Sequence, residues 1–118
     1  MTGIKSVRME VSNGSGMPRA GRAVADEMQM RGFDVYSVKA EPKPVPATTV
    51  VDLRSPTGAN ATIVAQALSV QKKWWRIPLH PRRFPLTVVA LDSSRYLEAR
   101  LVVGQDFKVF FPDVEPLH

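Results

Sequence analysis

A glycine-rich turn near the N-terminus is the stretch whose spacing comes nearest to a known chemistry. Residues 16–21, Gly-Met-Pro-Arg-Ala-Gly, have the glycine spacing of a phosphate-binding Walker loop at a predicted strand-to-helix junction. Arg22 stands where that loop needs its lysine, and Ala23 stands where it needs a magnesium-binding hydroxyl. Pro18 also removes an amide hydrogen from the phosphate cradle. The sequence therefore argues against a Walker-type nucleotide site.

A dinucleotide fingerprint is the other interpretation of this turn. Gly14 and Gly16 fit its first two glycines, but Arg19 occupies the third place, where close helix packing needs glycine. What remains is a tight turn whose backbone amides precede a helix, an arrangement that can hold an anion weakly. We predict an anion-binding turn formed by Asn13, Gly14, Ser15 and Gly16.

Residues able to carry enzymatic chemistry are few. The chain has no cysteine, and neither of its two histidines, His80 and His118, has a partner at metal-ligand or catalytic-triad spacing. Ser15 lacks the glycine-flanked elbow of hydrolases, so we expect its hydroxyl to cap a helix or close the turn. Single aspartates at predicted strand ends usually close turns and caps; they are Asp34, Asp52, Asp92 and Asp106. We therefore predict no catalytic residue, no metal site and no cofactor.

The strongest signal for binding lies between Ser69 and Pro85, where basic residues, aromatics and prolines replace any periodicity. Positive side chains attract a polyanion, and interleaved aromatic rings can stack on sugar or base faces. We predict an anionic-polymer site made by Lys72, Lys73, Trp74, Trp75, Arg76, Arg82 and Arg83. The alternative is that one tryptophan packs in the core, while the basic residues keep an exposed connection soluble.

Length and charge set the wider limits. The 118 residues fit one domain over residues 1–118, with a core over about residues 4–111 and a tail over 112–118. The formal net charge of +5 favours anionic partners without specifying one. No apolar run has membrane-spanning length and no basic-then-apolar leader opens the sequence, so we expect neither a spanning helix nor a signal peptide in it.

The opening residues predict a strand, a helix and a second strand. Residues 7–11 alternate apolar and polar side chains, which indicates a strand with one buried face. A helix begins near Pro18, with Ala20, Val24 and Met28 on its apolar stripe, and Gly32 ends it. A strand over 33–38 then completes a right-handed βαβ unit with parallel strands.

The next residues predict a second strand followed by a capped helix. A strand over 48–53 precedes a helix that Ser55 or Thr57 caps, and the helix has an apolar stripe of Ile63, Val64, Ala67 and Leu68. Further strands are predicted over 86–91 and 97–103, with an edge strand over 74–79 and a short extension over 107–111. The predicted fold class is α+β: a two-layer sandwich with two helices on one face of a mixed four- to six-stranded sheet.

Six short stretches together resemble the LytR C-terminal domain family. They are N-G-S-G-x-P at 13–18, V-A at 24–25, R-G-F-D-V at 31–35, T-T-V-V-D at 48–52, D-S-S-R-Y at 92–96 and L-V-V-G-Q-D-F at 101–107. The resemblance covers roughly residues 7–107. The chain departs from the family pattern at Arg19, where a glycine usually follows the proline, and in the long segment over 72–85.

This resemblance implies a non-catalytic accessory module of cell-envelope assembly. Such domains lie behind the LytR-CpsA-Psr catalytic domain, which transfers phosphate-linked glycopolymers to peptidoglycan, or alone behind a single membrane anchor. The implied location is extracytoplasmic, with membrane or wall attachment through the parent protein. The resemblance does not name the ligand of the domain itself, and we expect an anionic wall polymer or an envelope protein as its partner. The alternative, which rests on the positive charge and the glycine turn, is a cytoplasmic nucleic-acid or nucleotide binding domain.

Overall fold

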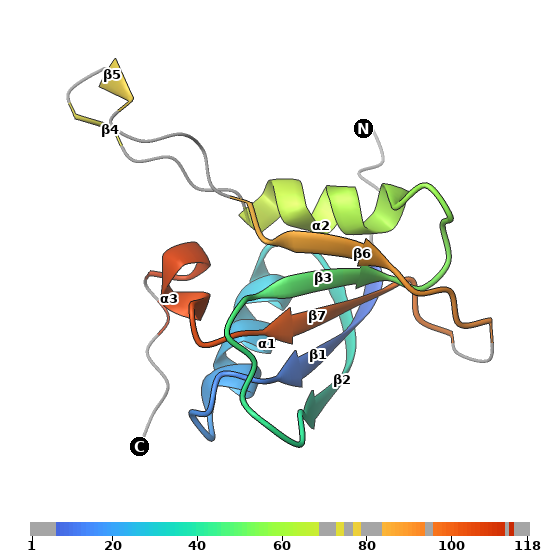
Figure 1. The fold of residues 1–118 in the computed structure, drawn as a ribbon, viewed down its shortest axis with the longest axis horizontal. Coiled ribbons are helices and arrows are strands. Elements are labelled where there is room, and N and C mark those ends of the chain that lie inside the picture. Colours follow the sequence, from blue (N-terminus) through green and yellow to red (C-terminus); the bar gives the residue numbers. More distant parts are fainter. Residues whose placement is uncertain are drawn as a thin grey trace.

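A five-stranded mixed sheet forms the centre of the computed structural model, which describes residues 7–68, 73–74, 77–78, 84–93, 96–112 and 114 (Figure 1). Its strands are β1 (Arg8–Asn13), β2 (Asp34–Ala40), β3 (Thr49–Asp52), β6 (Leu86–Val89) and β7 (Ala99–Val103), in the spatial order β2-β1-β7-β3-β6. The helices are α1 (Ala20–Met30), α2 (Ala59–Leu68) and α3 (Phe107–Phe110). The architecture confirms the predicted α+β sandwich.

One strand–helix–strand unit lies on each side of β7. In the first, β1 and β2 are adjacent and parallel and are joined by α1, as the sequence predicts. In the second, β3 and β6 are adjacent and parallel and are joined by α2. β7 pairs parallel to β1 and antiparallel to β3, so the last strand of the chain connects the two units.

Both long helices cover the same face of the sheet. The buried residues of α1, including Val24 and Met28, join those of α2, including Val64 and Leu68, in one apolar cluster with Met9 and other strand residues. The predicted stripe of α1 is therefore confirmed. The stripe of α2 is displaced, because Ala67 is exposed while Ala61 and Ala65 are buried.

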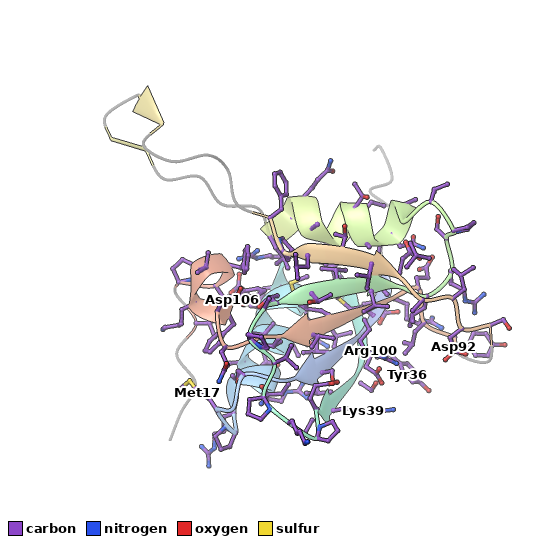
Figure 2. The ribbon with its side chains drawn as sticks, in the orientation of Figure 1. Met17, Tyr36, Lys39, Asp92, Arg100 and Asp106 are labelled. Atoms are coloured by element: carbon purple, nitrogen blue, oxygen red, sulfur yellow. The ribbon has the colours of Figure 1, made fainter. Side chains whose placement is uncertain are left out.

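The face without helices is polar beside β1. Glu10 is only 1% exposed, and its carboxylate accepts a hydrogen bond from Arg100 Nε at 2.8 Å and lies 3.1 Å from Lys39 Nζ. Figure 2 shows Lys39 and Arg100 together on the strands that flank β1. Both faces of β1 are thus buried. The face toward the helices is apolar, and the opposite face is ionic because Lys39 and Arg100 reach Glu10 from the two flanking strands.

Three predicted elements differ in the structure. Residues 107–110 form helix α3, where Phe107 and Phe110 lie three positions apart and are both buried, instead of extending the sheet. The last strand begins at Ala99, two residues later than predicted. In place of an edge strand over 74–79, β4 (Lys73–Trp74) and β5 (Ile77–Pro78) pair only with each other, outside the five-stranded sheet.

Candidate functional site

The predicted anion-binding turn is closed by its own hydrogen bonds. Gly14 N donates to Val103 O at 2.8 Å, and Ser15 N donates to Asn13 Oδ1 at 3.1 Å. Ser15 Oγ accepts a hydrogen bond from Met17 N at 3.0 Å, which confirms that this hydroxyl closes the turn. The N-cap residue of α1 is Arg19, whose side chain makes no capping hydrogen bond, and the hydroxyl of Ser15 contacts Asn13 and Met17 within the turn. Three amides of this turn therefore already have acceptors inside the protein.

The surroundings of the turn are also unlike a phosphate cradle. A small hollow of about 160 Å³ beside it includes the side chain of Glu41, whose carboxylate accepts a hydrogen bond from the Ser12 hydroxyl. A carboxylate at this place repels an anion. A side chain in place of Gly14 would meet Val45 Cγ2 at 2.8 Å, so that glycine serves close packing. Anion binding at residues 13–16 stays a prediction.

The predicted polymer site falls mostly outside the described residues. Lys73 and Trp74 form β4, and the other five positions, Lys72, Trp75, Arg76, Arg82 and Arg83, lie in the part of the chain that the structure leaves undescribed. Their role as a site stays a prediction.

A larger polar hollow, of about 630 Å³, lies at the opposite end of the sheet. It is lined by Arg8, Asp34, Arg54, Ser55, Asn60, Tyr96 and Glu98. Arg8 Nε lies 3.1 Å from Asp34 Oδ2, and the backbone N–H of Arg8 donates to Glu98 Oε1 at 3.1 Å. Two arginines and two carboxylates give the lining donors and acceptors but no net charge.

Sequence reasoning missed this hollow because its residues come from distant segments. Arg8 opens β1, Asp34 opens β2, and Glu98 directly precedes β7. Because these three strands run parallel, their N-terminal ends lie together at the same end of the sheet. The one available signal was the alternation along β1, which assigns Arg8 to the polar face but does not identify its partners.

Asp52 is the most constrained carboxylate of the described residues. It is fully buried, and its Oδ2 accepts hydrogen bonds from Asn60 N at 2.8 Å and Ala61 N at 3.0 Å, at the start of α2. Burial by itself would raise the pKa of Asp52, but hydrogen bonds from the Ser55, Ala61 and Arg54 amides lower that pKa below its ordinary value. The group is thus held as a structural anion, which does not suit a general acid or base.

The cap of α2 therefore differs in part from the prediction. Ser55 Oγ accepts a hydrogen bond from Ala59 N at 3.3 Å, as expected of a cap, but Asp52 satisfies the next two amides. Asp106 has a similar turn-closing role, since its Oδ1 accepts hydrogen bonds from Thr48 N at 2.8 Å and Thr48 Oγ1 at 2.6 Å. Among the residues that the structure describes, no group of three or more His, Cys, Asp or Glu side chains could hold a metal ion.

Comparison with protein families gives a match over most of the chain. The family model LytR_C, described as LytR cell envelope-related transcriptional attenuator, matches residues 6–107. The chain belongs to this family. The matched residues include all five strands of the central sheet and both long helices. Comparisons with curated proteins and with solved structures gave no match.

Membership in the LytR_C family fixes the general context of the domain. The family is one of cell-envelope-related proteins. Within the described residues, no helix is long and apolar enough to cross a membrane.

Proposed function

We propose that this LytR_C domain is a non-catalytic binding or scaffolding module of an extracytoplasmic cell-envelope protein, and that it contacts an anionic wall polymer or a partner envelope protein. The observation that carries this proposal is the family match over residues 6–107. The net charge of +5 supports it, because a positive surface attracts phosphate-bearing polymers. Attachment to membrane or wall would come through the parent protein.

The basic–aromatic segment over 72–83 is the candidate polymer contact. Phosphate contacts by lysine and arginine release condensed counterions, so binding through them should weaken steeply as salt is added. Stacking on Trp74 or Trp75 should persist at higher salt and change the tryptophan fluorescence. The contribution of phosphate contacts and the contribution of aromatic stacking can therefore be separated in one series of titrations at increasing salt.

The test is a titration of the purified domain with three probes: a teichoic-acid-like polymer, peptidoglycan fragments and single-stranded nucleic acid. Arg82→Gln/Arg83→Gln should weaken polymer binding and reduce its salt dependence. The matched control is Arg19→Gln/Arg22→Gln, which removes the same charge from exposed positions at α1. If both variants lost the same polymer affinity, the loss would follow from the lower net charge, and this result would contradict a site at 72–83.

The nucleic-acid alternative is decided by the same titration. It rests on the positive charge and the glycine turn, and it gains nothing from the hydrogen bonds that occupy the amides of Gly14 and Ser15. Saturable binding to the wall polymer with weaker binding to nucleic acid supports the envelope function. The reverse preference would overturn it.

A further inference from the structure

The two edges of the sheet differ in how they are protected. On the outer edge, β2 carries the charged residues Asp34 and Lys39. Its register also shifts, because Met9 pairs with Val35 and Glu10 pairs with Ser37, which leaves Tyr36 without a partner on β1. Charged side chains and bulges are two of the devices that keep an edge strand from pairing with another chain. The β2 edge is therefore protected.

The β6 edge has neither device. Leu86 N donates to Thr48 O and Ala90 N donates to Asp52 O, so the even-numbered amides point toward β3. Because amides alternate along a strand, those of Thr87 and Val89 point away from the sheet. β6 is the terminal strand in the sheet order, so these outward groups have no strand partner within the five-stranded sheet. Pro85 precedes the strand and removes none of its N–H groups.

The side chains of β6 are uncharged and exposed, and three of the four are apolar. Leu86 is 57% exposed, Val88 is 47% exposed and Val89 is 45% exposed. Phe84 and Leu91, at either end of the strand, are also exposed, and residues 84–91 contain no charged side chain. Val88 pairs in register with Val51 and so lies on the face without helices, whereas Val89 lies beside Gly58 at the start of α2. Each face of the strand thus presents an exposed valine and no charge.

The helix beside this edge is uncharged as well. α2 packs against β3 and β6, and its ten residues include no Asp, Glu, Lys or Arg. Its exposed positions are the small or neutral residues Ala59, Thr62, Gln66 and Ala67. By contrast, the surface of α1 carries the ion pairs Arg22–Asp26 and Arg31–Glu27. Figure 1 shows α2 alongside β6, so one side of the molecule presents an uncharged helix next to an unprotected strand.

We propose that β6 is a dimerisation edge, at which a second copy of this chain adds its own β6 in the antiparallel direction and extends the sheet. A two-fold axis at Val88 would pair Val88 with its own counterpart and Thr87 with Val89, so the outward N–H and C=O groups would satisfy each other. Val88 would meet its own counterpart on the face without helices, Val89 would meet the uncharged Thr87 on the helix face, and the two α2 helices would approach through uncharged residues. A charged partner finds no complementary charge at this edge, whereas a second copy matches it in length, polarity and register. This inference is independent of the proposed polymer contact.

The test uses the natural absence of cysteine from the chain. Directly opposed residues of a non-hydrogen-bonded antiparallel pair have Cα atoms about 4.5 Å apart, which a disulfide can span. Val88→Cys should therefore give a disulfide-linked dimer under mild oxidation. Tyr36→Cys, at an exposed position on the protected β2 edge, is the matched control and should remain a monomer.

Sedimentation equilibrium supplies a second measurement. The unmodified domain should show concentration-dependent dimerisation, which Val89→Lys should weaken by roughly tenfold or more and Tyr36→Lys should leave unchanged. Circular dichroism checks that each variant is folded. A domain that stays monomeric at every concentration, with Val88→Cys and Tyr36→Cys cross-linking equally slowly, would overturn the proposal. So would a monomer that binds an extended apolar peptide at β6, since the edge would then belong to a different protein.

Discussion

Arg100 and Glu10 are joined across the face of the sheet without helices, where Arg100 Nε donates to Glu10 Oε2 at 2.8 Å although 90 positions separate the two residues. The pair lies on adjacent parallel strands, directly in register. Glu10 is buried, so its charge has lost most of its hydration and depends on Arg100 and on the nearby Lys39. A buried carboxylate that loses its partner is costly, and this makes the pair a sensitive point of the fold.

Arg100→Met should lower the free energy of unfolding by about 2 to 4 kcal/mol, because it removes the closely paired arginine from the buried Glu10 carboxylate. The matched control is Arg22→Met, which removes an arginine from the solvent-exposed pair with Asp26 and should cost about 0.5 kcal/mol or less. Urea unfolding of both variants measures the difference. Equal losses would contradict the importance given to the buried pair.

Local patterns predict the strands and helices better than they predict these contacts. The alternation along β1 identifies Met9 and Val11 as core residues, and the structure confirms both. It also assigns Glu10 to the polar face, but burial of that residue depends on Lys39 and Arg100, which come from separate strands. Strand order is a property of tertiary pairing, so no local period reveals it. The same reason hides the hollow around Arg8 and Glu98.

Met28→Ala should destabilise the domain by about 2 to 5 kcal/mol, because it removes a fully buried side chain and leaves a cavity under α1. Met30 lies on the same helix but is 83% exposed, so Met30→Ala should change the free energy of unfolding by about 0.5 kcal/mol or less. The two substitutions remove the same atoms and differ only in burial. Denaturant midpoints that coincide would show that the stripe of α1 does not face the core.

The helical predictions succeeded where a helix has one polar face and one apolar face. Four-residue spacing placed Val24 and Met28 correctly, since α1 has a clear polar face opposite them. α2 is alanine-rich and lacks charged residues, so its sequence hardly distinguishes one face from another. The pattern consequently predicts Ala67 in the core, whereas the structure buries Ala61 and Ala65 and exposes Ala67. For α3, the short segment Phe-Lys-Val-Phe fits a strand or a helical turn equally well.

Asp52→Asn should lower stability by about 1 to 2 kcal/mol at neutral pH, because the carboxylate that caps α2 becomes a weaker acceptor. The folded-state pKa of Asp52 is lowered, so its ionised form stabilises the fold above the ordinary value of 3.8, and that contribution is lost as pH falls through the lowered pKa. The difference between wild type and Asp52→Asn should thus stay constant from neutral pH down to about pH 5 and then shrink in more acidic solution.

Chemical unfolding of both proteins across this pH range provides the measurement. Asp26→Asn is the control, since Asp26 lies on the exposed surface of α1. A wild-type advantage that grows as pH falls would have the wrong sign for a lowered pKa and would contradict the role given to the Asp52 carboxylate.

Titration of the domain with ATP and magnesium should give no saturable binding and no hydrolysis. Arg22 and Ala23 occupy the two positions where a Walker loop needs lysine and a hydroxyl. The structure adds a second reason, since the amides of Gly14, Ser15 and Met17 already donate to Val103 O, Asn13 Oδ1 and Ser15 Oγ. A phosphate could recruit them only by breaking hydrogen bonds that close the turn, at a cost of about 1 kcal/mol each. Calorimetry provides the measurement, with Arg22→Gln tested beside the wild type. Micromolar affinity that Arg22→Gln abolishes would contradict this expectation and move the domain toward nucleotide binding.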